Sequence, residues 1–480
     1  MKKAKLFILA LLYILASCKD TDDSVPLPFH ANIYSYKIDV GQVGNEVITN
    51  SRTENSVKIT VEYGTDLSSV APEIEISPYA TIEPASGTAI NFEENNNTQV
   101  YTLTAASGRE YIWTVQIQEL PDPEAIRLEL IPNGGWDANV TVYHDLTYND
   151  FLTRYSGWNG GDGCVSTELP DGSILWSFQD SFFGTVSQDR IRQDNVFVRN
   201  AGFIQTDGLL SGYQQLNPEN FFGKAQTWIK YPGANENNDD HWYWGGPSQI
   251  VGDELQMVLG HVIPGDFAGV HASTDVAVFN VSDMSFKELL LNKYEGNLTW
   301  DSSIFYGPDG YTYMYATEGI GFCYSRMYVA RVADHDLRGD WEYYTKTGWS
   351  TTPPENHDDY VVVAEGRITQ PNVFQDGEKF YLVSQGGCFG LDINIMESDS
   401  PVSGFTNERT IYMIPEKYTS DSPEPPGYIT YNAVVHHALS QEGELVVSYN
   451  INPIGFENNF NSPGTADNYR PYFVRVYNWK

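Results

Sequence analysis

Apolar and polar residues alternate along much of the chain, and a period of two residues predicts β-strands rather than helices. In the region 31–119 the alternation is clearest at residues 57–64, 81–92 and 100–117, and Ser-Gly pairs interrupt the last two stretches as turns do. These strands predict a small β-sandwich. Two prolines follow within residues 119–123, and because proline resists both helices and sheet ladders, this segment predicts a linker.

From residue 125 to residue 480 the alternation continues, and no stretch sustains an amphipathic helix longer than about ten residues. One unit recurs: an apolar strand, a tight turn with Gly beside Asp or Glu, and a returning apolar strand. Its turns are Asp171-Gly172, Gly252-Asp253, Asp309-Gly310, Asp376-Gly377 and Glu442-Gly443. These units predict an all-β fold, a five-bladed β-propeller, because repeated four-stranded units are typical of propellers. A two-sheet sandwich is the alternative.

The N-terminal residues 1–18 contain three lysines, an apolar run and small residues before a cysteine. This is the pattern of a secretion signal, and the run is too short to span a bilayer. The sequence Leu15-Ala16-Ser17-Cys18 resembles a bacterial lipobox, which implies cleavage before Cys18 and lipidation of its thiol. Residues 19–30 then form a linker, whose acidic residues resemble the export tags of surface lipoproteins. We therefore expect a surface-exposed protein of the cell envelope, in the outer membrane, that contacts the membrane only through its lipid anchor.

The composition narrows the choice of partner. The formal charge is −35, and such a field repels nucleic acids and anionic membrane surfaces, which favours a neutral or cationic ligand. The chain has 32 Tyr, 23 Phe and 11 Trp but only 19% charged residues, a composition that suits the stacking of sugars on aromatic faces and also suits any all-β protein. We expect a monomer that binds a polysaccharide or oligosaccharide.

Three cysteines remain after Cys18, namely Cys164, Cys323 and Cys388. An odd number argues against a disulfide framework, and no two of them have the spacing of metal ligands. We predict that they are small buried side chains. No motif predicts a cofactor or a metal ion; an acidic channel would suit a structural calcium or sodium ion, but no loop motif supports one.

Two aspartates flank the first of the recurring turns at nearly equal distances. In an antiparallel hairpin, residues equally far from the turn lie opposite each other on one face. Asp162 precedes Asp171 by nine residues and Asp180 follows Gly172 by eight, so we predict that Asp162 and Asp180 are cross-strand neighbours. Like charges this close raise one pKa and leave the other group ionised, which supplies a proton donor beside a proton acceptor.

The same reasoning pairs Trp244 with His261 and Asp301 with Glu318 in the next two hairpins. In a propeller the innermost strands surround the channel, so we expect these pairs to converge with Asp162 and Asp180 at one mouth. The alternative is that acidic residues at strand ends only bond backbone amides. A β-bulge in any hairpin would shift the register and turn a side chain to the other face.

Further candidates come from strand starts and loops. Glu365 precedes the fourth hairpin and either overhangs the mouth or is an ordinary exposed glutamate. His436 and His437 are adjacent and point to opposite faces of a strand, which argues against a two-histidine metal site. Tryptophans pack in cores by default but also stack on sugars. The candidate substrate-binding residues are Trp158, Trp244, His261, Trp300, Arg367, Gln370 and Asn372.

Two segments resemble five-bladed furanosidase-type glycoside hydrolases: WDSSIFYGPDGYTYMYATEG at 300–319 and EGRITQPNVFQDGEKFYLVSQGG at 365–387. This resemblance implies that Asp162 is the general base, that Asp301 tunes the acid, and that Glu365 is the general acid. The sequence departs from that family at Gly163, where the family has a proline after its first aspartate.

A second resemblance fits the first hairpin better. GGDGCVSTELPDGSILWSFQDSFFG, residues 160–184, is similar to the opening of propeller families known as domains of unknown function, some of which resemble or include endo-D-arabinanases. This resemblance implies that Asp162 and Asp180 take part in catalysis. The region 31–119 resembles the immunoglobulin-like modules of surface proteins.

These features predict a surface-anchored glycoside hydrolase acting on a neutral or weakly charged polysaccharide, with a furanoside polymer such as an arabinan as one candidate. The catalytic candidates are Asp162, Asp180, Asp301, Glu318 and Glu365. The rival hypothesis is a glycan-binding lipoprotein that does not cleave its ligand, and a third is a structural adhesin.

Overall fold

A computed structural model describes residues 29–51, 53–94, 96–120, 122, 125–206, 210, 212–265, 269–416 and 427–480. The chain divides into two compact units, Met1–Leu120 and Pro121–Lys480. The predicted signal segment and lipidation site at Cys18 lie outside the described residues. Among the residues that are described, no helix is long and apolar enough to cross a membrane.

The first unit is a β domain built from two sheets. The larger sheet has the order β2-β3-β7-β6-β5, with strands Gln42–Asn50, Asn55–Val61, Glu110–Glu119, Thr98–Thr104 and Thr81–Glu83. The smaller sheet pairs β1 (Ile33–Lys37) with β4 (Glu73–Ile76). Buried and exposed side chains alternate along β7, and its buried face, which includes Trp113, packs into a core shared with the smaller sheet.

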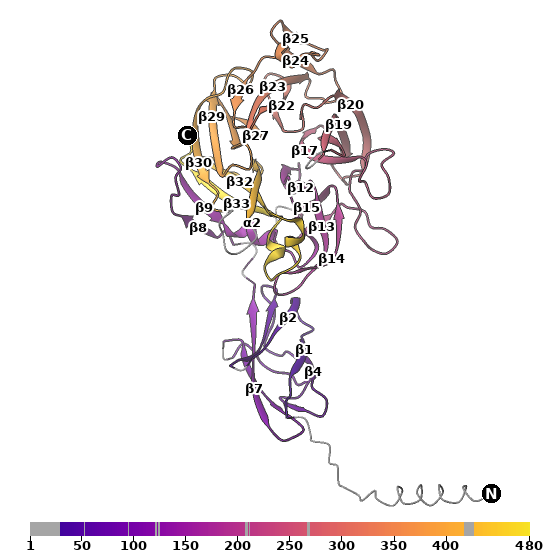
Figure 1. Ribbon diagram of the computed structural model, residues 1–480, viewed down its shortest axis with the longest axis vertical. Helices are drawn as coiled ribbons and strands as arrows, with labels where there is room; N and C mark the ends of the chain where they lie inside the picture. The colour runs from indigo at the N-terminus through magenta and orange to yellow at the C-terminus, as the bar shows by residue number, and fades with distance from the viewer. Residues whose placement is uncertain are drawn as a thin grey trace, which may run out of the picture. The chain divides into compact units, whose positions relative to one another are not determined.

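The second unit is a β-propeller, whose sheets follow one another along the chain and stand in a ring in Figure 1. The first sheet comprises β11 (Val165–Glu168), β12 (Ile174–Phe178), β15 (Ala201–Gln205) and β16 (Tyr213–Gln215). The second comprises β17 (Trp242–Val251), β18 (Glu254–Ile263), β19 (Val270–Asn280) and β20 (Phe286–Glu295). The third comprises β21 (Ser303–Tyr306), β22 (Tyr311–Gly321), β23 (Tyr324–Ala333), β24 (Glu342–Thr345) and β25 (Gly348–Ser350), and β26 (Ala364–Gly366) pairs with β23.

The fourth sheet comprises β27 (Thr369–Asp376), β28 (Lys379–Gln385), β29 (Asp392–Ser398) and β30 (Thr406–Met413). The fifth sheet closes the ring, because it combines the last strands of the chain with the first strands of this unit. Its members are β31 (Tyr428–Val435), β32 (Glu444–Pro453), β33 (Pro471–Tyr477), β9 (Thr141–Asp145) and β8 (Leu128–Ile131). Ring closure pairs β33, the last strand of the chain, with β9 near the start of this unit, so neither strand is left as an unpaired edge.

An additional three-stranded sheet extends the first hairpin of the propeller. It contains β10 (Ser156–Gly161), β13 (Ser181–Val186) and β14 (Arg192–Val198). The only helical segments among the described residues are short: α2 (Leu146–Phe151), η2 (His357–Asp359), η3 (Phe456–Asn459) and η4 (Thr465–Asp467). Asp145 caps α2 by accepting a hydrogen bond from the Tyr148 amide.

The cysteine prediction is wrong for two of the three residues. Cys323, in the turn between β22 and β23, forms a disulfide with Cys388, in the loop after β28, so the bond joins the third sheet to the fourth. The two Cα atoms lie 4.9 Å apart although 65 positions separate the cysteines in sequence. An odd count requires one unpaired cysteine but does not forbid a pair. Cys164 is free and buried, as predicted.

Candidate active site

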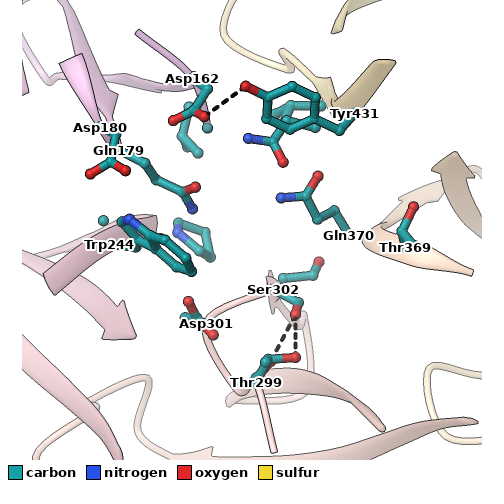
Figure 2. A pocket seen from close by; sticks show the side chains of 18 of the residues that line it. Asp162, Gln179, Asp180, Trp244, Thr299, Asp301, Ser302, Thr369, Gln370 and Tyr431 are labelled. Carbon is teal, nitrogen blue, oxygen red and sulfur yellow. Dashed lines mark hydrogen bonds between the residues drawn. The ribbon is translucent and has the colours of Figure 1, made fainter. Parts of the chain in front are cut away.

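A cavity of about 1230 Å³ opens among the innermost strands of the propeller, and residues of all five sheets line it. Figure 2 shows side chains from several sheets turned toward one shared space, among them Asp162, Asp180, Trp244, Asp301 and Gln370. The cavity is larger than is usual for sites that bind a single small molecule, which are about 300–1,000 Å³.

Asp162 and Asp180 face each other across the first hairpin, as the sequence predicts. The strands pair Val165 with Ser177 on one side of the two aspartates and Gly161 with Ser181 on the other, so both pairings keep the same register. The Asp162 amide donates to the Asp180 carbonyl at 3.2 Å. The hairpin does not end here, because it continues as β10 and β13, and the aspartates therefore mark the junction between two sheets.

Glycines leave room for the acid pair. A Cβ atom on Gly161 would lie 2.3 Å from the Ser181 hydroxyl and 3.2 Å from the Asp180 carbonyl oxygen. Gly163 has a φ of +57°, and a Cβ there would lie 2.4 Å from the Gln179 side chain. The glycine at 163, where the furanosidase pattern has a proline, is thus required by the conformation of this junction.

The carboxyl group of Asp162 is buried in a pocket with two tyrosines. Tyr431 on β31 donates its hydroxyl to Asp162 Oδ2 at 2.9 Å (Figure 2), and the other carboxyl oxygen is buried without a hydrogen-bond partner in the described part of the chain. Burial, and then the nearby Asp180 charge, raise the pKa of Asp162 to about 7, against the opposing effect of hydrogen bonds from Tyr431 and Tyr469.

Asp180 differs from Asp162 because a cation lies beside it. Arg199 Nη1 lies 3.5 Å from Asp180 Oδ2, while the Arg199 guanidinium stacks 4.2 Å from the Trp242 ring centroid and its Nε donates to the Asn238 carbonyl at 3.1 Å. Burial raises the pKa of Asp180 to about 6, and Arg199 limits that rise. Arg199 thus favours the ionised form of the Asp180 carboxyl group over the protonated form.

Asp301 supplies a third carboxyl group from the turn that precedes β21. It packs against the second sheet, where a Cβ on Gly260 would lie 2.3 Å from Asp301 Oδ2 and a Cβ on Gly246 would lie 2.7 Å from its carbonyl oxygen. The His271 Nδ1 atom lies 3.9 Å from Asp301 Oδ1, and neither of these two atoms has a hydrogen-bond partner among the described residues. Unpaired buried polar atoms at a cavity are candidates for contact with a ligand.

Amide and hydroxyl groups complete the lining. Gln179 and Gln370 point into the cavity (Figure 2), Thr369 also lines it, and the hydroxyls of Ser302 and Thr299 bond to each other at its wall. These groups can donate and accept hydrogen bonds without carrying a charge. Within the described residues, no group of three or more His, Cys, Asp or Glu side chains is arranged to hold a metal ion.

Comparisons with known proteins identify the family of the chain. The model of the family described as "Domain of unknown function (DUF5005)" matches residues 145–479. The chain belongs to this DUF5005 family. A second model, described as "SGBP, N-terminal", matches residues 33–117. No curated protein matches the chain.

Solved structures are also similar to the chain. A crystal structure of a candidate hydrolase from Bacteroides ovatus ATCC 8483 is 33% identical, with a TM-score of 0.66, and the match covers 73% of this chain and 94% of that one. The GH43_1 enzyme from Xanthomonas citri complexed with xylotriose is 12% identical, with a TM-score of 0.37 and coverage of 68% and 87%. The Bacillus subtilis arabinanase Arb43A is 9% identical, with a TM-score of 0.36 and coverage of 66% and 96%.

The structure corrects the pairing of Trp244 with His261. A β-bulge between Gly245 and Ser248 shifts the register by one residue, so Trp244 pairs with Gly260 and His261 pairs with Tyr243. Trp244 lines the cavity as predicted, whereas His261 is buried on the opposite face, where its ring stacks 3.9 Å from that of Tyr231.

The pairing of Asp301 with Glu318 is also shifted by one residue. The turn of this hairpin is centred on Asp309, as shown by the pairing of Tyr306 with Thr312, and Thr317 rather than Glu318 lines the cavity. Glu318 points to the other face, where it accepts hydrogen bonds from Tyr328 at 2.5 Å and from His357 at 2.7 Å. The prediction that Glu318 belongs to the site is therefore wrong.

Glu365 and Arg367 do not line the cavity either. Glu365 is exposed on β26 and forms an ion pair with Arg326 at 2.9 Å, so the acid implied by the furanosidase resemblance is not in this cavity. Arg367 donates to the Gly387 carbonyl at 3.2 Å and lies 3.7 Å from Asp392. The strand that carries Glu365, β26, pairs with β23 of the third sheet, where Glu365 lies opposite Arg326.

Two of the three predicted tryptophans belong to the core. Trp158 is 1% exposed and donates to the Ser181 hydroxyl at 3.2 Å, and Trp300 is fully buried in the cluster between the second and third sheets. Gln370 and Asn372 do line the cavity, but Asn372 uses its amide to bond the carbonyls of Gln370 and Ala433. Asn372 thus also joins the fourth sheet to the fifth.

Sequence reasoning missed three residues that contact or approach the acids: Tyr431, Arg199 and His271. Tyr431 and Arg199 come from outside the hairpins that supplied the pairing rule, and His271 lies on a third strand, so no spacing along the chain connects them with the aspartates. One signal was available for Tyr431, because it starts the strand of the fifth recurring unit.

Proposed function

We propose that this DUF5005 protein is a glycoside hydrolase that cleaves a neutral polysaccharide by general acid and base catalysis in the propeller cavity. The observation that carries the proposal is the pair formed by Asp162 and Asp180: opposed across one hairpin, buried at the cavity, and raised in pKa to about 7 and about 6. Glycosidic cleavage needs one protonated and one ionised carboxyl group on either side of the scissile bond.

The surroundings of the two acids divide their roles. Arg199 favours the ionised form of Asp180, so we assign the carboxylate to Asp180 and the proton to Asp162. Asp162 then donates its proton to the glycosidic oxygen. Asp180 either activates a water molecule or attacks the anomeric carbon, and the stereochemistry of the product distinguishes these two routes. This assignment reverses the base role that the furanosidase resemblance implies for Asp162.

Asp301 is proposed to act on the bound sugar rather than on the proton of Asp162. It reaches the same cavity from the turn before β21, and its Oδ1 atom and the facing His271 Nδ1 lack partners in the described part of the chain. A carboxylate in this position can accept hydrogen bonds from sugar hydroxyls and strengthen them as positive charge develops on the ring.

The charges at the cavity favour a neutral substrate. Among the described lining residues the acids include Asp162, Asp180, Asp239 and Asp301, whereas Arg199 is the only lysine or arginine and already lies beside Asp180. A glycan that carries carboxylates or sulfates would be repelled. A furanoside polymer such as an arabinan is the first substrate to test, on the strength of the sequence resemblance. Anchoring at the cell surface through Cys18 is part of the proposal and rests on the lipobox alone.

The test is a panel of arabinan, xylan, galactan and glucans incubated with the full chain between pH 6 and 7, with new reducing ends as the measurement. We expect one neutral polysaccharide to be cleaved, and Asp162→Asn to abolish cleavage while leaving the melting temperature at least as high as that of the parent. Cleavage that persists in Asp162→Asn would contradict the assignment of the acid.

A second candidate is glycan binding without cleavage. It is favoured by the match of residues 33–117 to the family described as "SGBP, N-terminal", and by the absence of Glu365 from the described lining of the cavity. Retardation of the protein in a polysaccharide-containing native gel, with no reducing ends from any polymer of the panel, would support the binder and exclude the hydrolase.

A further inference from the structure

A loop beside the acid pair carries a phenylalanine that lines the cavity. The loop joins β28 to β29, and Phe389 lines the cavity while remaining 41% exposed. The Phe389 ring centroid lies 6.4 Å from that of Tyr431, the residue that donates its hydroxyl to Asp162. Tyr431 therefore links Phe389 to Asp162, the proposed proton donor.

The backbone of this loop is held at several points. The disulfide ties Cys388 to Cys323, and a Cβ on Gly387 would lie 2.2 Å from the Cys323 carbonyl oxygen, so the loop packs tightly on the turn between β22 and β23. Gln385 donates to the Gly390 carbonyl at 2.6 Å. Arg367, which does not line the cavity, accepts a hydrogen bond from the Gly387 amide on its carbonyl oxygen and donates to the Gly387 carbonyl, each at 3.2 Å.

The conformation of the loop is one that surrounding contacts must enforce. Cys388 and Phe389 have φ values of 58° and 57°, in the left-handed region that non-glycine residues seldom adopt. Such residues persist where the surrounding structure holds them and are common at ligand-binding sites. A strained loop that served only packing would bury its large apolar side chain, but this loop presents Phe389 to the cavity.

We propose that Phe389 is a preformed platform on which a sugar ring of a neutral oligosaccharide stacks, next to the ring whose bond Asp162 and Asp180 act on; this rests on the proposed function. The aromatic face accepts the apolar C–H face of a sugar, and a fixed loop loses little conformational freedom when the ligand binds. The acidic lining disfavours an anionic glycan as the occupant. The disulfide and Arg367 act through the loop and are positioning groups.

The test measures binding in the full chain with Asp162→Asn as the background, so that cleavage does not interfere. Phe389→Ala is the test variant, Phe389→Tyr the conservative one, and Phe322→Ala the matched control, because Phe322 adjoins Cys323, is 92% exposed and does not line the cavity. The probes are oligosaccharides prepared from the neutral polysaccharides of the panel, and the dissociation constant is measured by calorimetry.

We expect Phe389→Ala to weaken binding roughly tenfold, Phe389→Tyr to restore it, and Phe322→Ala to leave it unchanged, since loss of one stacked ring is worth up to about that factor. Replacing both Cys323 and Cys388 by serine should weaken binding by a smaller factor. Equal binding by Phe389→Ala and its parent, equal weakening by Phe322→Ala, or failure of every oligosaccharide to bind the parent would each overturn the platform. Binding that depends on Phe389 without cleavage by the unmodified chain would leave the platform standing and refute the hydrolase.

Discussion

The hairpin that carries Asp162 and Asp180 and the two hairpins that follow it share one plan but differ in how their candidate residues are placed across the two strands. In the first, residues equally far from Asp171 pair as far as Val165 and Ser177, and pair again at Gly161 and Ser181 on the other side of the aspartates. In the second, a bulge between Gly245 and Ser248 adds a residue to one strand. In the third the turn is centred on Asp309, which leaves Asp301 and Glu318 at unequal distances from it.

The comparison shows that a difference of one position in the pairing decides whether a side chain lies in the site. Side chains alternate across a strand, so a shift by one moves a partner from the cavity to the opposite face. Asp180 therefore reaches the cavity, whereas His261 and Glu318 face away from it. The turns at Asp171 and Asp309 are alike, because each aspartate accepts a hydrogen bond from the amide two residues later; only the spacing of the acids around them differs.

The largest expected effect comes from comparing Asp180, which reaches the cavity, with Glu318, which faces away from it. Asp180→Asn removes the proposed carboxylate and should lower kcat/KM on the cleaved polysaccharide by about 10³-fold, within the range for loss of a general acid or base. Glu318→Gln is the matched control and should retain activity within about twofold, because Glu318 faces away from the cavity. Steady-state rates on one polysaccharide compare the two variants. A large loss in Glu318→Gln would show that the face of the third hairpin turned away from the cavity also serves catalysis.

A second variant disturbs the second hairpin where Asp301 packs against it. Gly260→Ala places a methyl group where Asp301 Oδ2 now lies, at 2.3 Å, and the overlap should displace Asp301. We expect kcat/KM to fall by about 10- to 100-fold and the free energy of unfolding by about 1–3 kcal/mol, as for overpacking. Gly319→Ala on β22 has open space around its Cβ and is the control. Full activity in Gly260→Ala would mean that Asp301 can move without consequence.

The proposed difference in protonation between Asp162 and Asp180 can be tested by replacing Arg199. Arg199 lowers the pKa of Asp180, so Arg199→Gln should raise that pKa and Asp180 should need a higher pH to ionise. The acidic limb of the pH profile of kcat/KM, expected near pH 6, should move upward by about one unit, while Arg199→Lys should move it less. If the acidic limb of the profile does not move in Arg199→Gln, Arg199 does not control the pKa of Asp180.

The smallest effect concerns stability. The pKa of Asp162 is raised from 3.8 in its ordinary state to about 7 in the fold, so the folded chain binds this proton more tightly than the unfolded chain. The fold therefore loses stability as the pH rises through that window, and the penalty is complete above it. Asp162→Asn removes the penalty and should raise the melting temperature by a few degrees at pH 8 but not at pH 4. An equal shift at both pH values would point to a cause other than charge.

Local pattern was sufficient for part of the site. Asp162, Asp180, Asp301 and Trp244, which hairpin pairing singled out, all line the cavity, as do Gln370 and Asn372, which were candidates from the start of a strand. Trp158 and Trp300 were misassigned since a large aromatic residue at a strand start looks the same whether it faces the core or a ligand. Glu365 was carried over by resemblance, and the strand it belongs to pairs along the third sheet instead.

The sequence by itself determined the all-β character, the recurring hairpins and the opposition of Asp162 to Asp180, because strand alternation and hairpin pairing depend on residues close together in the chain. Only the tertiary structure decided the surroundings of each acid, since Tyr431 and Arg199 reach the pair from elsewhere in the propeller. It also decided the Cys323–Cys388 bond, which joins two loops on neighbouring sheets. Contacts of this kind arise when the ring of sheets brings distant segments together, and no spacing along the chain encodes them.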